Sequence, residues 1–316
     1  MKYLIRSFCF LLTLLAANSL AQDADTVVRV DTQLVPFEVT VSDRDGNPVK
    51  NLQSGDFKIT EDGQPRSADF FQPIVKSDSG RPLSIVFALD VSGSMTQQEI
   101  ERLRSAMGTF INRLADYNSY FAVTAFGMHV RTVQSFTNKP EALNKTFTRL
   151  EGDSDGLSTH AYDAIDDAVR MIATKSPKKL SGRFPKRAVI VITDGFPVGD
   201  VVSPATVIER ANNAQTSIYS VILPSFSPLQ LTNKPVPTLL EISGLIEKTG
   251  GKSFYATDKN FESLFRSLAE EITSSYAIAI YPTESKRTDG RFHEVKIEST
   301  KGYVIKQNRG GYNGKP

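Results

Sequence analysis

Three oxygen-bearing side chains alternate along a short segment that follows a long apolar run. They are Asp90, Ser92 and Ser94, in the stretch Asp-Val-Ser-Gly-Ser, and the apolar run before them spans residues 83–89. In an open α/β sheet, ligands bind where strands end at their carboxyl edge, so side chains placed there can converge on one point. One carboxylate and two hydroxyls suit a hard cation such as Mg²⁺ or Mn²⁺ better than zinc, for which His and Cys would be expected.

Two further oxygen donors occupy comparable places later in the sequence. Thr159 ends the stretch Gly-Leu-Ser-Thr before an expected helix, and Asp194 follows the apolar run 188–192. Together with the first three, they make five oxygen donors, of which two are carboxylates. The sequence therefore predicts a site for a divalent cation, Mg²⁺ or alternatively Mn²⁺ or Ca²⁺, formed by Asp90, Ser92, Ser94, Thr159 and Asp194.

The same residue types also have structural interpretations. Asp and Ser are favoured where strands run into helices because they cap helices and stabilise turns, so Asp-x-Ser-x-Ser alone would be weak evidence for a metal. Thr96 and Glu99 match the S/T-x-x-E pattern of a capping box at the start of a helix. The acidic loop 151–155 before Thr159 has two interpretations, tuning of the metal affinity or ordinary solvated charge. We interpret His129, His160 and His293 as surface or core imidazoles.

The elements that must position these donors follow from the hydrophobic pattern. Strands buried on both faces, as in a mainly parallel sheet covered by helices, are predicted at 83–89, 120–126, 188–192 and 218–223. Helical spacing predicts helices at 100–114, at about 162–172, from Pro204 behind the N-cap candidate Ser203, at 239–250 and at 261–272. The predicted fold class is therefore α/β, with a doubly wound, mostly parallel, Rossmann-like sheet.

A different strand pattern flanks this α/β region. Apolar and polar residues alternate at 35–42 and, after the last helix, at 276–280, 295–297 and 303–305. Asp62-Gly63 separates two further strand runs, 57–61 and 66–71, and marks a tight hairpin. The first segment has too little apolar surface to fold alone, so we expect the terminal strands to form one small β-sandwich-like module. The Gly-rich stretch 308–316 is expected to fray.

The first residues predict a cleaved signal peptide. Lys2 and Arg6 flank the polar start of a short apolar run, which cannot span about 30 Å of hydrocarbon, and small residues near Ala21 offer a cleavage site. Cleavage removes both basic residues, the only cysteine (Cys9) and no acidic residue, which leaves equal numbers of basic and acidic side chains. This balance gives no reason to expect nucleic acid or an anionic membrane as partner. We predict a secreted or periplasmic protein without membrane insertion after cleavage.

The donors and their order along the chain resemble the von Willebrand factor type A family over roughly residues 82–275. The metal-ion-dependent adhesion site of that family is written Asp-x-Ser-x-Ser, a distant Thr, and an Asp usually followed by Gly. The resemblance implies that Ser92 and Ser94 bind the metal directly, that Asp90 and Asp194 act partly through water, and that Thr159 joins in the liganded state. It also implies an open coordination position that an Asp or Glu of a partner protein fills. The loop before Thr159 departs from the family's frequent Gly-Gly-Thr run.

These observations predict four segments, which are a signal peptide at 1–21, an N-terminal β segment at 22–75, an A domain at 82–275 and a C-terminal β segment at 276–316. This arrangement resembles secreted bacterial VWFA-related domain proteins. We expect no enzyme, because Ser92-Gly93-Ser94 does not form a Gly-x-Ser-x-Gly elbow, the chain after residue 21 has no cysteine, and no Gly-rich phosphate-binding loop ending in Gly-Lys-Ser/Thr occurs. The predicted function is metal-dependent protein binding or adhesion, in which the cation bridges to an acidic residue of the partner. A structural role in an envelope assembly and, third, metal-assisted hydrolysis stay open as alternatives.

Overall fold

The computed structural model describes residues 34–77, 80–92, 97–150, 155–156, 158–177, 183–193, 197–223, 237–257 and 260–315, with the backbone alone at 97–100. The predicted signal peptide at 1–21, the capping residue Thr96 and the site residues Ser94 and Asp194 therefore lie outside the described residues. Within the described ranges, no helix is both long enough and apolar enough to cross a membrane.

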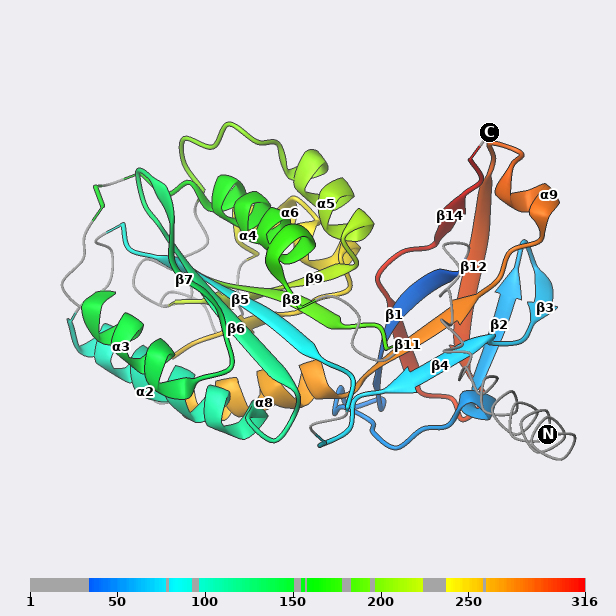
Figure 1. Ribbon diagram of the computed structural model, residues 1–316, viewed down its shortest axis with the longest axis horizontal. Coiled ribbons are helices and arrows are strands. Elements are labelled where there is room, and N and C mark those ends of the chain that lie inside the picture. Colours follow the sequence, from blue (N-terminus) through cyan, green and yellow to red (C-terminus); the bar gives the residue numbers. More distant parts are fainter. Residues whose placement is uncertain are drawn as a thin grey trace, which may run out of the picture. The chain divides into compact units, whose positions relative to one another are not determined.

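The centre of the α/β region is a six-stranded sheet in the order β10-β9-β8-β5-β6-β7 (Figure 1). Its strands are β5 (Leu83–Asp90), β6 (Ser119–Phe126), β7 (Val130–Thr137), β8 (Lys186–Thr193), β9 (Thr216–Ile222) and β10 (Ser253–Tyr255). All neighbours are parallel except β6 and β7, which are antiparallel. Every residue of β5 and β9 is buried, as expected for apolar strands covered on both faces. The predicted α/β fold class is confirmed.

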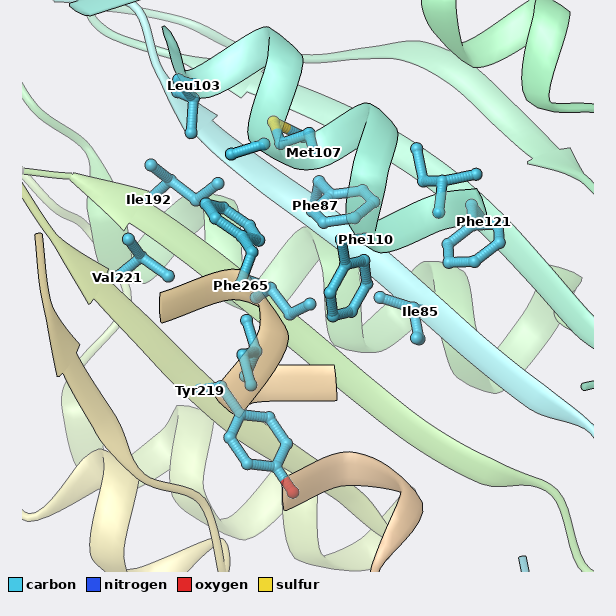
Figure 2. Packing of buried hydrophobic residues seen from close by; sticks show 14 of the residues in the cluster. Ile85, Phe87, Leu103, Met107, Phe110, Phe121, Ile192, Tyr219, Val221 and Phe265 are labelled. Carbon is cyan, nitrogen blue, oxygen red and sulfur yellow. The ribbon is translucent and has the colours of Figure 1, made fainter. Parts of the chain in front are cut away.

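Helices cover both faces of this sheet (Figure 1). On one face lie α2 (Gln97–Leu114), α3 (Pro140–Leu150) and α8 (Phe261–Thr273), and on the other lie α4 (Ala161–Lys175), α5 (Pro204–Asn213), α6 (Leu239–Ile242) and α7 (Leu245–Lys248). Figure 2 shows Phe110 of α2 beside Phe87 of β5 and Phe265 of α8, with ring centroids 5.7 Å and 5.9 Å away. These aromatic contacts hold two helices on the strand that leads to the candidate site.

Several elements differ from the sequence-based expectation. The helix predicted at 239–250 is two short helices, because Gly244 between α6 and α7 has a φ of +74°, a left-handed backbone that interrupts the helix. The strand predicted at 66–71 is also divided, since β3 (Gln64–Arg66) pairs with β2 (Phe57–Glu61), whereas β4 (Phe70–Pro73) belongs to a different sheet. Strands β7 and β10, at the edges of the central sheet, and helix α3 have no counterpart among the predicted elements.

The first and last segments of the described chain pair with one another in two four-stranded sheets, β13-β1-β11-β4 and β14-β12-β2-β3. In one sheet, β1 (Val35–Ser42) lies antiparallel between β11 (Ser275–Ile280) and β13 (Val304–Gln307). In the other, β2 pairs with β12 (Phe292–Ser299). Side chains from both sheets share one core, which includes Phe37, Ile59, Ile278 and Ile297. The predicted small β-sandwich-like module, built from N- and C-terminal strands, is confirmed. Two short helices, η1 (Ser54–Asp56) and α9 (Glu284–Arg287), complete it.

The end of the chain does not fray as the sequence predicted. β14 (Gly311–Asn313) pairs with β12, and Asn308 and Tyr312 are buried. A Cβ on Gly311 would lie 2.0 Å from the carbonyl oxygen of His293, so the glycine permits a close approach that no other residue would allow. Tyr312 also donates a 2.5 Å hydrogen bond to Glu61 of β2. The glycines that suggested disorder therefore allow the last strand to join the sheet.

A buried ionic cluster links this β module to the α/β region. Arg81 donates two hydrogen bonds to the carboxylate of Glu38 in β1, and the Nζ of Lys186 lies 3.2 Å from the same carboxylate. Arg81 and Lys186 are buried, and the Glu38 side chain is only 9% exposed. Burial raises the pKa of Glu38, but the charges of Arg81 and Lys186 outweigh burial and hold the pKa below its ordinary value. Because Lys186 begins β8 and Arg81 precedes β5, the cluster lies at the amino edge of the sheet.

Candidate metal-binding site

The carboxyl end of β5 holds the first predicted metal-site residue, Asp90. It is the last residue of the strand, and it is buried. Its Oδ1 accepts a hydrogen bond from the backbone N–H of Ser92 at 3.0 Å, and its Oδ2 accepts one from the hydroxyl of Thr193 at 2.7 Å. Thr193 is the last residue of β8 and directly precedes Asp194. Asp90 therefore ties the Asp-x-Ser-x-Ser loop to the neighbouring strand end from which Asp194 follows.

The backbone next to Asp90 is held by β6 and by the loop that leads to Thr159. The N–H of Val91 donates to the carbonyl of Phe126 at 2.8 Å, and the carbonyl of Val91 accepts from the N–H of Asp155 at 3.0 Å. The carbonyl of Asp155 in turn accepts from the N–H of Met128 at 2.8 Å. These bonds place residues 155–156 across the ends of β5 and β6.

Thr159 belongs to the same edge of the sheet and is buried. Its N–H donates to the carbonyl of Val198 at 3.2 Å, and its carbonyl accepts from the N–H of Val198 at 2.9 Å. The N–H of the next residue, His160, donates to the carbonyl of Gly127, just beyond β6, at 3.2 Å. Thr159 is thus fixed between the loop that follows β6 and the loop that follows β8.

Asp163, in the first turn of α4, fastens the loop that follows β8. Its Oδ1 accepts the N–H of Val202 at 2.8 Å and the N–H of Val201 at 3.1 Å, and its Oδ2 lies 3.1 Å from Nδ1 of His160. The N–H of Asp163 donates to the carboxylate of Asp200 in the same loop at 2.9 Å. Burial raises the pKa of Asp163, but the hydrogen bonds from Val202 and Val201 outweigh burial and hold the pKa below its ordinary value. This positioning residue was not predicted from the sequence.

Asp155, in the described part of the acidic loop, joins this loop to the one that follows β6. The Asp155 carboxylate accepts the backbone N–H of His129 at 2.7 Å, and its other oxygen lies 3.1 Å from Nδ1 of the same histidine. The side-chain hydrogen bond to His129 lowers the pKa of Asp155. Asp155 therefore connects two loops at the carboxyl edge, whereas the rest of the acidic stretch lies outside the described residues.

Three of the five predicted site residues, Asp90, Ser92 and Thr159, lie at one edge of the sheet, and the other two lie outside the described ranges. Hydroxyl and carboxylate oxygens are the donors that Mg²⁺, Mn²⁺ and Ca²⁺ prefer. An ionised carboxylate offers about four acceptor positions, and the Asp90 carboxylate uses two of them for Ser92 and Thr193. The donor set of this edge is therefore compatible with a hard cation, with Asp90 available to act through a bound water.

Residues 84–271 match the family model of the von Willebrand factor type A domain. No curated protein sequence matches the chain. Among solved structures, the chain is similar to an aerotolerance-related membrane protein from Bacteroides fragilis NCTC 9343 (16% identity, TM-score 0.46), over 60% of this chain and 98% of that one. It is also similar to the vWF domain of the type V pili tip protein Mfa5 from Porphyromonas gingivalis (11% identity, TM-score 0.46), over 61% and 95%. A third similar structure is proximal thread matrix protein 1 from the mussel byssus with a zinc-occupied MIDAS motif (14% identity, TM-score 0.45), over 66% and 48%.

The matched region covers more than half of the chain and contains the whole edge described above, including Asp90, Ser92 and Thr159. It begins in β5 and ends in α8, so it also contains the central sheet and the helices on both of its faces. The chain therefore belongs to the von Willebrand factor type A domain family.

Proposed function

We propose that this protein is a non-catalytic module that binds another protein through a divalent cation at the carboxyl edge of its central sheet. Domains of its family commonly mediate protein–protein interaction and often bind a divalent cation. The observation that carries the proposal is the setting of Asp90, a buried carboxylate that is bonded to the Ser92 amide and the Thr193 hydroxyl. These bonds hold the start of the Asp-x-Ser-x-Ser loop at the end of β5.

In this proposal Ser92 and Ser94 bind the cation through their hydroxyls, whereas Asp90 and Asp194 act partly through water and Thr159 joins when a ligand is present. The two hydrogen bonds that the Asp90 carboxylate already accepts support such an indirect role. Mg²⁺ is the expected cation, with Mn²⁺ or Ca²⁺ as alternatives. The bound cation supplies positive charge at an open position, which attracts an Asp or Glu of the partner and repels Lys or Arg.

We place this protein in the periplasm or outside the cell after cleavage of residues 1–21, with a protein rather than nucleic acid as its ligand. The chain after residue 21 has equal numbers of acidic and basic side chains. It therefore lacks the basic excess that attracts nucleic acid, which supports a protein as the ligand.

Titration of the purified protein with MnCl₂ and MgCl₂ tests the metal site. A cation bound only by the folded state stabilises it by about 2.7 kcal/mol at a hundredfold excess over Kd, so the thermal midpoint should rise. Ser92→Ala should lose this rise and the calorimetric binding signal. Ser84→Ala is the matched control, because Ser84 is buried near the other end of β5 and its hydroxyl has no partner among the described residues. Equal responses of the two variants would refute the site.

A second readout tests the bridge to a carboxylate. Thr159→Ala keeps all predicted carboxylates, so we expect Mn²⁺ to bind as in wild type. Binding of a fluorescent Asp-containing peptide in Mg²⁺ should weaken, because the Thr159 hydroxyl is assigned to the liganded state. The same peptide with Asn in place of Asp should bind neither protein above the level seen in EDTA. If the Asp and Asn peptides bind alike, the cation does not bridge to a carboxylate.

A further inference from the structure

Exposed apolar side chains gather beside the candidate metal site. Nine large apolar residues are exposed in the described part of the chain, and five of these precede or follow strands at the carboxyl edge or lie in α6. Val201 is 87% exposed, Val198 58% and Met128 53%. Leu239 and Ile242 of α6 complete the group, and we call these five residues the apolar rim. Met128, Val198 and Val201 lie in the loops after β6 and β8, which sets them apart from apolar residues scattered singly over a surface.

Hydrogen bonds connect the apolar rim to the residues that hold the site. Val198 exchanges two backbone bonds with Thr159, and the N–H of Met128 donates to the carbonyl of Asp155. On the α4 side, the hydroxyl of Tyr162, in the first turn of the helix, donates to the carbonyl of Leu239 at 3.2 Å. Figure 1 shows the loops after β6 and β8 at the same end of the central sheet. The apolar rim is therefore part of the same surface as the metal site.

The loop that carries Val198 and Val201 is held in place while these side chains face solvent. Asp163 accepts the N–H groups of Val201 and Val202, and the hydroxyl of Ser158 donates to the carbonyl of Val198 at 2.9 Å. The backbone is therefore bonded at Val198 and again at Val201 and Val202. If the loop moved to bury the valine side chains, several of these bonds would break. A partner that covers them would gain apolar contact without first ordering the loop.

The carboxylates next to the apolar rim are engaged within the protein. Asp155 is bonded to His129, Asp163 accepts loop amides, and Asp200 accepts the N–H of Asp163. Among the described residues, these carboxylates are thus held by hydrogen bonds within the protein, beside apolar side chains that are exposed. The matching ligand chemistry is an acidic side chain with bulky apolar neighbours.

We propose that the apolar rim determines which acidic ligands this protein accepts: the partner presents its metal-binding Asp or Glu with large apolar side chains close by in sequence, and these pack on Val198 and Val201. The inference rests on the proposed function, because the acidic residue is anchored by the cation. It adds that the carboxylate alone is insufficient for full affinity. Burial of one valine-sized side chain corresponds to about tenfold in affinity.

Two fluorescent peptides test this inference, one with a single Asp flanked by Leu and Phe and one with the same Asp flanked by Ser and Gly. In Mg²⁺, wild type should bind the Leu/Phe peptide about tenfold or more tightly than the Ser/Gly peptide. Val201→Ser should reduce this preference while Mn²⁺ binding stays at the wild-type level. Val304→Ser, which changes an exposed valine of β13 in the β module, is the matched control and should keep the preference.

The outcomes separate this inference from the proposed function. If both peptides bind equally well and only in Mg²⁺, the metal bridge stands and the role of the apolar rim is refuted. If the Leu/Phe peptide binds equally in Mg²⁺ and EDTA, the rim is a docking surface that does not involve the cation, which also overturns the inference. If neither peptide binds in Mg²⁺ above its level in EDTA, both proposals fail.

Discussion

At the end of β5, the carboxylate of Asp90 is shared between a backbone amide two residues away and a hydroxyl on the neighbouring strand β8. Hydrogen bonds to a charged acceptor in a buried place are stronger than those between neutral groups. The bond from Thr193 therefore fixes the position of Asp90 relative to β8, and with it the loop that begins at Val91. Thr193 is a positioning residue in this arrangement, because it acts on the site through Asp90.

Thr193→Val should remove this hydroxyl with little change of shape. We expect a loss of about 1.5–3 kcal/mol in the free energy of unfolding, because a buried carboxylate oxygen loses its donor. Mn²⁺ affinity should fall as well, since the Asp90 carboxylate is no longer oriented. Thr124→Val in β6 is the matched control, because Thr124 is equally buried and its hydroxyl lacks a partner among the described residues. Urea denaturation and Mn²⁺ titration measure both effects, and similar results for the two variants would contradict this role.

The residues of the candidate site differ in how far the sequence predicts them. Asp90 and Ser92 come at the end of a buried strand and Thr159 comes just before a helix, which are positions that the sequence pattern identifies and that the structure places at one edge of the sheet. Asp163 escapes such reasoning, because its partners are the backbone N–H groups of Val201 and Val202, which leave no pattern of residue types. The sequence also does not predict that the side chains of the apolar rim are exposed, because their exposure depends on how the loops fold.

At the scale of elements, the pairing of β12 with β2 and β14 creates a charged cluster around His293. Its Nδ1 lies 2.9 Å from the carboxylate of Asp62, its Nε2 lies 3.1 Å from that of Asp289, and its ring stacks on Tyr312 at a centroid distance of 5.1 Å. The hydrogen bond with Asp62 raises the pKa of His293 above 6.5. Hydrogen bonds from Lys286 and His293 lower the pKa of Asp62 to about 2. When it is protonated, His293 can donate to both aspartates and hold them together.

The β module should lose stability as pH rises above about 6.5. A raised pKa means that the folded state binds the proton more tightly than the unfolded chain does, so the stabilisation is complete below about pH 6.5 and is lost as pH rises through the folded pKa. Thermal midpoints measured from pH 6 to pH 9 should fall for wild type. His293→Gln should be less stable than wild type at pH 6 and show a shallower fall. Parallel curves for the two proteins would exclude the mechanism.

The sequence predicts strands that are covered on both faces. It does not predict strands whose formation depends on contact with one particular neighbouring segment. β5 and β9 have mostly apolar sequences, and every residue of both strands is buried. β7 lies at the sheet edge, where its residues are partly buried or exposed, so the apolar signal is weak. The last strand depends on the close approach of Gly311 to His293, which a Gly-rich sequence does not distinguish from a frayed end.

At the scale of the whole molecule, the buried cluster of Glu38, Arg81 and Lys186 joins the β module to the amino edge of the central sheet. Glu38→Gln would leave two buried cations without their carboxylate, so we expect a loss of roughly 3–5 kcal/mol in the free energy of unfolding. The control is Asp116→Asn, which removes an exposed partner of Lys76 and should change stability by less than about 0.5 kcal/mol. Urea denaturation above pH 6 measures both. A loss for Glu38→Gln no larger than that of the control would show that the cluster does not hold the two parts together.

The strand pairing also bears on how the domains are organised along the sequence. We propose that an A domain at 82–275 is inserted into a β module formed by the segments 22–75 and 276–316. The central sheet and its helices form two hydrophobic clusters of their own, and the β module has a third. Within the described residues, β1 and β2 find their partners only in the last segment, apart from the short β3 and an isolated bridge between Ser42 and Pro48.

Deletion of residues 291–316 tests this organisation, because it removes β12, β13 and β14 while leaving the A domain complete. β2 then loses β12 and β1 loses β13, and the β-module core loses Val295, Ile297 and Tyr312. We expect amide protons of β1 and β2 to exchange rapidly with deuterium, while those of β5, β6 and β8 stay protected. Arg81 and Lys186 would lose Glu38, but release of β1 would open them to water, which can solvate both charges and spare the A domain. Deletion of residues 314–316 alone keeps all three strands and should preserve protection throughout. Unchanged protection of β1 and β2 in the larger deletion would mean that the first segment folds without the last, and loss of protection in β5 would mean that the two parts form one cooperative unit.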